Sequence, residues 1–163
     1  MPDKSTQALP KNLVQIDKWE IRTFQALSVD MLYALLRLRS AVFVVEQQCI
    51  FQDMDGLDAS ALHVLGWSST QLVATARCMP AGSSEFTEAS IGRVATSPLV
   101  RGSGAGHELV RRAVAALQGQ WGIQPIRIGA QAHLENFYQQ HGFVKDGAPY
   151  LEDGILHIEM LRP

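Results

Sequence analysis

The chain has 163 residues, of which 47% are hydrophobic and 18% charged, which is typical of a globular protein and excludes a disordered one. Its length suits one domain, so we expect a single domain over residues 1–163. The formal net charge of −2 gives no support for nucleic-acid binding, and no apolar run approaches the length of a membrane span.

The N-terminal third predicts a tail, a strand, a helix and a loop, in that order. Residues 1–11 are polar with two prolines, and we expect a loose tail without a signal or transit peptide. Apolar alternation at 19–23 predicts the first strand. Ser28 is a suitable N-cap for a helix, which should end near 41–46, where five apolar residues in sequence break the amphipathic pattern. Residues 47–60 contain three aspartates and a glycine and indicate a loop.

The rest of the chain alternates strands with helices. Two apolar segments at 63–67 and 71–79 flank Ser-Ser-Thr, which indicates a strand, a turn and a strand. A strand at 89–96 leads into a glycine-rich stretch, and a helix follows that should stop near Gly119. The remaining expected elements are a strand at 125–130, a helix at 134–141 and strands at 143–144 and 154–160. This order predicts an α/β (α+β) fold with a central mixed sheet flanked by helices.

The glycine-rich stretch Arg101-Gly102-Ser103-Gly104-Ala105-Gly106 lies where a strand ends and a helix begins. The first N–H groups of a helix have no internal partner and carry partial positive charge, so this place suits an anion, most often a phosphate. His107 and Glu108 follow the last glycine, which excludes a P-loop, and the third glycine of a dinucleotide fingerprint is absent. The alternative is a connection that only turns the chain.

Two motifs in this order resemble one family. Arg101, Gly104 and Gly106 fit Arg/Gln-x-x-Gly-x-Gly/Ala, which resembles the pyrophosphate loop of the GNAT N-acetyltransferases, enzymes that bind acetyl-CoA. Residues 138–143, Tyr-Gln-Gln-His-Gly-Phe, resemble the family's Tyr-x-x-x-Gly-Phe segment. Segments at 38–47, 52–56, 129–134 and 152–158 resemble the ElaA-like branch of the family. The resemblance covers nearly the whole chain from about residue 19 and implies the GNAT acyl-CoA N-acyltransferase fold, with acetyl-CoA as cosubstrate and no metal.

The resemblance also implies which residues hold the coenzyme. Backbone groups near Val94 and Thr96 would bind the pantetheine and the thioester carbonyl, and the N–H groups of the loop would bind the pyrophosphate. Arg101 either touches a phosphate or is a solvated loop charge. The family often has Asn where this chain has Gln131, whose amide can still contact the coenzyme. The expected loop residues are Gly102, Ser103, Gly104, Ala105 and Gly106.

Acetyl transfer to an amine needs a proton donor for the leaving thiolate and a base for the amine. Tyr138 is the candidate acid, because a phenol and a thiolate have similar basicity; the alternative is a tyrosine that only packs in the core. Glu46 is the preferred base, since partial burial after an apolar run would raise its pKa, and His63 is the reserve. The aspartates of 47–60 are expected to form a solvated acidic loop.

The acceptor is expected to be a primary amine, either a small molecule or a peptide, that approaches over residues 43–58. Two other functions stay open: an acyltransferase like the acyl-homoserine-lactone synthases, and a non-catalytic CoA-binding regulatory module. The synthase-like function rests on a faint resemblance, carried by Arg39, Phe43, Trp67, Asp53 and Asp55.

The two cysteines, Cys49 and Cys78, lack the spacing of a metal site or a redox motif, which favours free thiols in the cytoplasm. A homodimer is also left open.

Overall fold

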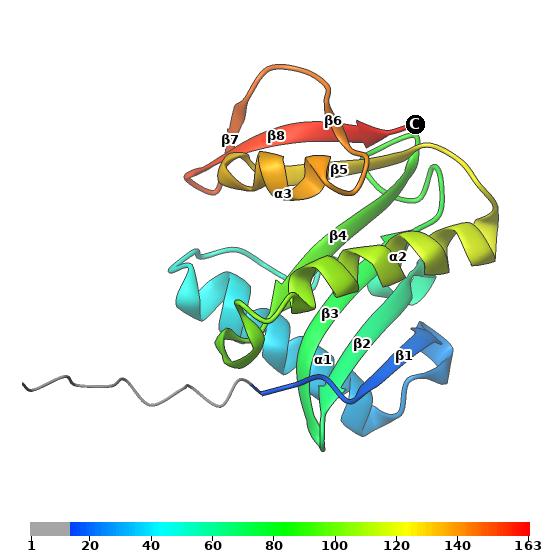
Figure 1. Ribbon diagram of the computed structural model, residues 1–163, viewed down its shortest axis with the longest axis vertical. Coiled ribbons are helices and arrows are strands. Elements are labelled where there is room, and N and C mark those ends of the chain that lie inside the picture. Colours follow the sequence, from blue (N-terminus) through cyan, green and yellow to red (C-terminus); the bar gives the residue numbers. More distant parts are fainter. Residues whose placement is uncertain (1–13) are drawn as a thin grey trace, which may run out of the picture.

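The computed structural model describes residues 14–163, so the tail expected at residues 1–11 lies outside the described part (Figure 1). The strands are β1 (Lys18–Thr23), β2 (Leu62–Ser68), β3 (Gln71–Met79), β4 (Ala89–Thr96), β5 (Ile126–Gln131), β6 (Val144–Lys145), β7 (Tyr150–Glu152) and β8 (Ile155–Arg162). The α-helices are α1 (Val29–Arg39), α2 (Ala105–Trp121) and α3 (Glu135–Gln139). Among the helices of residues 14–163, none has both the length and the apolar composition of a membrane span.

All eight strands of residues 14–163 belong to one mixed sheet, which is nearly divided in two at its centre. Strands β1 to β4 pair antiparallel in chain order, and β5 pairs antiparallel with β8, which also carries β6 and β7. Between these halves, β4 and β5 run parallel but share only two residue pairs, Ala89 with Ile126 and Ser90 with Arg127. Beyond them the two strands part, as Figure 1 shows. The predicted mixed sheet is therefore confirmed, and it opens into a V at its middle.

A cluster of charges holds the closed end of this V together. The guanidinium of Arg127 binds the carboxylate of Glu88 just before β4, at 2.9 Å. It also lies 2.8 Å from an oxygen of Asp146, between β6 and β7, and 3.0 Å from one of Glu159 on β8. Because one side chain joins four segments of the chain, the point where β4 and β5 separate is fixed.

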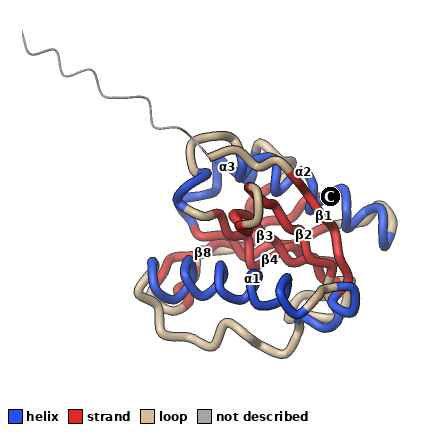
Figure 2. The backbone as a smooth tube through the Cα atoms, turned by 90° about the horizontal axis from the view of Figure 1, so that it is seen from below, coloured by secondary structure: helices blue, strands red, loops and turns tan. Residues whose placement is uncertain are grey.

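Helices cover both faces of the sheet, and each face has its own core. Figure 2 shows α1 along one face and α2 with α3 along the other. On α2, the residues that repeat at helical spacing are buried against β2, β3, β4 and β5, as their pattern predicted: Leu109, Val110, Ala113, Val114 and Leu117. On the opposite face, Leu35 and Leu38 of α1 pack with Leu65 and Leu72 of the sheet.

The ends of two helices and one short strand differ from the prediction. The helix α1 does end near the predicted place, but the chain continues without a break as a π-helical segment, Ser40–Glu46. The helix α2 runs past Gly119 to Trp121 and stops at Gly122, whose φ of 85° only glycine adopts readily. The strand β7 was not predicted, because three residues are too few to show an alternating pattern.

A solvated acidic loop was predicted for residues 47–60, but two of its three aspartates are buried, whereas Asp55 is exposed. Asp53 and Asp58 are both only 8% exposed, and the fully buried Arg39 of α1 binds the two of them. Its Nε lies 2.8 Å from an oxygen of Asp53, and one Nη lies 2.6 Å from an oxygen of Asp58. The other Nη donates to the backbone carbonyl of Asp53 at 3.1 Å. A buried guanidinium thus has an acceptor for each of its nitrogens.

Two further arginines complete what we call the arginine–aspartate network: Arg39, Arg77, Arg93, Asp53, Asp55 and Asp58. Arg77 of β3 holds both oxygens of Asp55, at 2.7 and 2.8 Å. Arg93 of β4 donates to the carbonyl of Asp53 at 3.0 Å, and its Nε lies 2.8 Å from an oxygen of the same residue as an ion pair too bent for a hydrogen bond. Three positive charges meet three negative ones, so the network is neutral.

Removing Arg39 should destabilise the fold strongly, because two buried carboxylates would lose their main partner. We expect Arg39→Leu to lower the free energy of unfolding by about 3–5 kcal/mol, measured by urea titration. Arg37→Leu is the matched control, since Arg37 is exposed on the same helix, and it should change this free energy by no more than about 0.5 kcal/mol. Equal urea midpoints for the two variants would contradict a structural role for the network.

Candidate active site

The parting of β4 and β5 opens a cleft of about 740 Å³ between the two halves of the sheet. Its walls come from the parts of β4 and β5 that no longer pair with each other, and from the π-helical segment, the glycine loop and α3. The cleft brings together most of the predicted coenzyme and catalytic residues: Val94, Thr96, Arg101, Gly106, Gln131, Tyr138 and Glu46. Predicted site residues from five separate segments of the chain therefore meet at one site.

The glycine loop borders this cleft through its first and last residues, Arg101 and Gly106. Gly102 and Gly104 have φ of 82° and 84°, a region that side chains disfavour, and the helix α2 begins immediately after them at Ala105. The first N–H groups of α2 therefore have no acceptor within the helix. Gly102, Ser103, Gly104 and Ala105 lie outside the lining of the cleft, whereas Gly106 belongs to it. This geometry fits a pyrophosphate bound to the loop's backbone.

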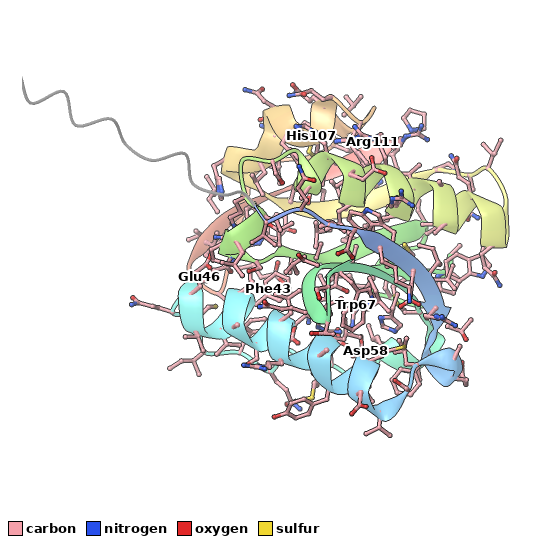
Figure 3. The ribbon with its side chains drawn as sticks, turned by 60° about the horizontal axis from the view of Figure 1, so that its bottom comes forward. Phe43, Glu46, Asp58, Trp67, His107 and Arg111 are labelled. Carbon is pink, nitrogen blue, oxygen red and sulfur yellow. The ribbon has the colours of Figure 1, made fainter. Side chains whose placement is uncertain are left out.

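Glu46 and Arg101 join the π-helical segment to the glycine loop. Arg101 donates to a carboxylate oxygen of Glu46 at 2.7 Å and to the backbone carbonyl of Thr96 at 2.8 Å. Glu46 was predicted to be partly buried, but its side chain is 38% exposed, so that premise is wrong. The reason is its place at the outer end of the π-helical segment, where Figure 3 shows it close to Phe43. The carboxylate of Glu46 already has a cationic partner, the guanidinium of Arg101.

Tyr138 lines the cleft from α3 and is 7% exposed. Its ring packs edge-on against Phe137 and Phe143, with centroids 5.0 and 5.9 Å away. Burial raises the pKa of its hydroxyl to about 12, so the phenol keeps its proton at neutral pH. The position of Tyr138 agrees with both interpretations of its role, as an acid and as a core residue, because its ring packs in the core and the residue still borders the cleft.

His63, the reserve base, is in the wrong place for that role. It is fully buried on β2 and is absent from the cleft lining. Its Nε2 lies 3.0 Å from the carbonyl oxygen of Asp58, and burial lowers its pKa. The residue faces the same side of the sheet as Arg77, its partner across the β2–β3 ladder, which places it behind the arginine–aspartate network. It contributes to the core of the fold.

Two walls of the cleft were not found from the sequence. The loop before β4 supplies Glu85 and Phe86, and the β7–β8 hairpin supplies Tyr150. One signal could have located the hairpin: Asp153 and Gly154 both have positive φ, 50° and 77°, and Asp-Gly is a preferred pair for such two-residue turns. The loop before β4 carries no comparable signal, because its residues show no period.

The cleft also contains a thiol, at Cys49. This side chain is 8% exposed and its Sγ lies 3.7 Å from the backbone carbonyl of Asp153. Desolvation, followed by the charges of Asp153 and Glu152, raises the pKa of the thiol. The nucleophilic form of a cysteine is the thiolate, so Cys49 is poorly suited to accept an acyl group.

Comparison with known proteins identifies the class. A family model described as an acetyltransferase (GNAT) domain matches residues 27–162, and the chain therefore belongs to the GNAT acetyltransferase family. Within that family it is 44% identical over 147 residues to protein ElaA of Escherichia coli strain K12, an alignment that covers 89% of this chain and 95% of ElaA. The ElaA-like branch expected from the sequence is confirmed.

Solved structures show the same relationship. The crystal structure of Escherichia coli ElaA matches with a TM-score of 0.84 at 43% identity, over 90% of this chain and 99% of ElaA. An acyl-CoA N-acyltransferase from Pseudomonas aeruginosa gives 0.85 at 42% identity, with the same coverage of both chains. The CoA-dependent acyl-homoserine lactone synthase BjaI shares the fold alone: its TM-score is 0.69 at 18% identity, over 85% of this chain and 78% of BjaI.

Two aspartates of the arginine–aspartate network, Asp55 and Asp58, make the stability of the fold depend on pH. Burial alone would raise the pKa of Asp58 and of Asp55, but hydrogen bonds and charge from Arg39 and Arg77 outweigh it, so both values lie below the ordinary one. A carboxylate whose pKa is lowered by folding stabilises the protein fully above the unfolded-state pKa of about 3.9, and this stabilisation is lost as pH falls further.

We therefore expect the free energy of unfolding to fall steeply below about pH 4, as measured by urea titrations between about pH 3 and 6. Asp55→Asn should make this fall shallower, because one of the responsible carboxylates is gone. Asp30→Asn is the control, since Asp30 is exposed in the first turn of α1. An identical slope in Asp55→Asn and the wild type would show that Asp55 does not contribute.

Proposed function

We propose that this protein transfers an acetyl group from acetyl-CoA to a primary amine by direct attack of the amine on the thioester. The observation that supports this most is the V between β4 and β5, with the glycine loop and the start of α2 at one end of it. Strands that part leave backbone N–H and C=O groups without a strand partner, and an extended pantetheine can use them. Family membership supports acyl transfer; the acetyl group and the amine are our proposal.

Each part of the site has a separate role in this proposed reaction. The N–H groups at the start of α2 hold the pyrophosphate, and the backbone of β4 near Val94 and Thr96 holds the pantetheine and polarises the thioester carbonyl. Gln131, whose amide donates weakly to Gln47 at 3.4 Å, can turn toward the same arm. Tyr138 keeps its proton until the thiolate leaves and then donates it. Cys49 stays protonated, which favours direct attack over an acyl-enzyme.

Calorimetric titration with acetyl-CoA, followed by measurement of free thiol in the presence of a panel of amines, tests the proposal. Saturable binding together with amine-dependent thiol release is the expected result. Binding without release to any amine would favour the non-catalytic CoA-binding module. Release only with S-adenosylmethionine as acceptor would favour an activity like that of the acyl-homoserine-lactone synthases. Absence of binding would contradict the proposed transfer from acetyl-CoA.

Gly106 offers a direct test of the coenzyme site. A Cβ at this position would lie 3.5 Å from the ring of Phe137, so a small side chain fits the fold but narrows the cleft. We expect Gly106→Val to weaken acetyl-CoA binding by about tenfold or more, since crowding of a packed site costs about 1–3 kcal/mol. Gly119→Val on the same helix is the control, because no atom lies within 4 Å of its added Cβ. Unchanged calorimetric affinity in Gly106→Val would place the coenzyme elsewhere.

Tyr138→Phe should lower turnover and leave acetyl-CoA affinity nearly unchanged. The ring still packs, so only the proton of the hydroxyl is lost, and general acid catalysis contributes about 10²–10⁴-fold. Steady-state kinetics with an active amine would measure the loss. Tyr33→Phe is the control, since Tyr33 is 71% exposed on α1. Equal kcat values in Tyr138→Phe and the wild type across the pH range would remove Tyr138 from the mechanism.

A further inference from the structure

The closed end of the cleft, where β4 and β5 meet, is walled by two aromatic rings that rest on the same glycine. A Cβ on Gly129 of β5 would lie 2.9 Å from the hydroxyl oxygen of Tyr150 and 3.8 Å from the ring of Phe86. Tyr150 comes from β7 and Phe86 from the loop before β4, so two distant segments meet over the backbone of β5. The ring of Tyr150 also stacks on His157, with centroids 5.8 Å apart.

The loop that carries Phe86 is held in place by its own hydrogen bonds. The hydroxyl of Ser83 donates to the carbonyl of Pro80 at 2.6 Å, and the N–H of Gly82 donates to the carbonyl of Thr87 at 3.1 Å. The N–H of Phe86 donates to the hydroxyl of Ser84 at 3.2 Å. Glu85, which lies between Ser84 and Phe86, is therefore presented to the cleft on a fixed backbone.

Glu85 and Asp153 differ from Glu46 and Asp55, the two carboxylates of the cleft that arginines bind, in their partners, and Glu85 is the one that lies beside Phe86. The carboxylate of Glu46 is bound by Arg101, and that of Asp55 by Arg77 and Arg93. Within residues 14–163, the side chain of Glu85 makes no hydrogen bond or ion pair. A carboxylate that faces a cleft and lacks a cation is suited to receive a cationic group of the substrate.

The surroundings of Glu85 also suit it to proton transfer. Although the side chain keeps contact with solvent, partial desolvation raises its pKa, and the negative charges of Glu152 and Glu159 raise it further against the opposing charge of Arg93. Among residues 14–163 the ion-pair partner of Glu152 is His157, at 3.9 Å, so its carboxylate adds to the negative potential. A base whose pKa is moved toward neutrality takes a proton from an ammonium group more readily than an ordinary glutamate.

We propose that Glu85 receives the protonated amine of the acceptor beside the rings of Phe86 and Tyr150 and removes its proton, so that the acceptors are cationic primary amines attached to an aromatic or apolar group. This rests on the function proposed above and replaces Glu46 as the base. Aromatic faces attract ammonium ions, and the same rings bury the apolar part of the amine.

The step is balanced as follows. The ammonium group gives one proton to the carboxylate of Glu85, which later releases it to water. The neutral nitrogen forms a bond to the carbonyl carbon of the thioester, and the bond from that carbon to sulfur breaks. Tyr138 gives its proton to the thiolate, and the second proton lost by nitrogen restores the tyrosine. The products are an N-acetyl amide, free CoA and one proton.

The probe is phenethylamine, with neutral 2-phenylethanol as the uncharged analogue. With acetyl-CoA saturating, Glu85→Gln should lower kcat/KM for phenethylamine by about 10²-fold and remove the acidic limb of the rate–pH profile, while the KM for acetyl-CoA stays unchanged. Glu135→Gln is the matched control, because Glu135 lies on α3 and does not line the cleft. Gly129→Ala, whose Cβ displaces the hydroxyl of Tyr150, should raise the KM for phenethylamine alone.

Binding measured without acetyl-CoA separates this proposal from the proposed function. Nuclear magnetic resonance titration should show phenethylammonium, and not 2-phenylethanol, binding to the wild type and to Glu135→Gln but not to Glu85→Gln. Equal binding or equal rates in Glu85→Gln and the wild type would overturn the role of Glu85. Failure of the wild type to bind phenethylammonium would overturn the acceptor class. Failure to bind acetyl-CoA, with amine binding intact, would overturn the transfer reaction and keep the amine site.

Discussion

A guanidinium that has lost all contact with water must be neutralised where it lies, and the structure around α1 follows from that constraint. Arg39 lies on the inner side of α1, one helical turn after Leu35, so both side chains face the sheet. The positive charge of Arg39 is neutralised by Asp53 and Asp58. The segment after the π-helical turn must therefore fold back toward α1, so that these two carboxylates reach the guanidinium. That segment then supplies Cys49, Phe51 and Leu57 to the cleft. The burial of one charge thus shapes one wall of the site.

The second half of the site depends on a limit to strand pairing. Strands β4 and β5 pair only near Ala89 and Ser90, and the ion pairs of Arg127 keep that junction closed. Continued pairing would satisfy the backbone of both strands and leave no cleft. Instead their free edges face each other across a gap in which an extended ligand can hydrogen bond to both. The same separation leaves Gly129 uncovered by β4, and the rings of Phe86 and Tyr150 close over it.

The parts of the fold and the site that could be predicted are those that depend on residues close together in the sequence. The glycine loop and Tyr138 lie in short motifs, and the helical spacing of α2 predicted its buried face, so these parts were found from the sequence. The pairing of Arg39 with Asp53, and of Arg93 with the same residue, joins positions far apart in the chain. A periodic pattern treats each charged residue as solvated, which is why the aspartates were misread. Partial burial of Glu46 was expected for a different reason, the apolar run that precedes it in the sequence.

Other parts could not be predicted because they depend on register. Nothing in the alternation of β4 or β5 states where their pairing stops, so the depth of the cleft was unknown. The position of His63 next to a predicted strand suggested a catalytic role, yet its register opposite Arg77 places it behind the network. The hairpin of β7 and β8 is an intermediate case, since the Asp153-Gly154 pair signals the turn although the strand itself is too short to recognise.

The bulge in β4 has a consequence for how the length of this strand can vary. Thr75 pairs with Ala95 and Arg77 with Gly92, so Arg93 and Val94 together oppose one residue of β3, and Arg93 takes a φ of 49°. Ile91 faces α2, whereas Ala95, an even number of positions later, faces α1. The inserted residue exchanges the two faces midway along the strand. Loss of one residue here would leave both flanking halves correctly oriented in the sheet, so a shortened strand could keep the topology while the network and the cleft wall lost Arg93. Loss of a single residue at this point is thus a route by which related chains diverge in activity and keep a common fold.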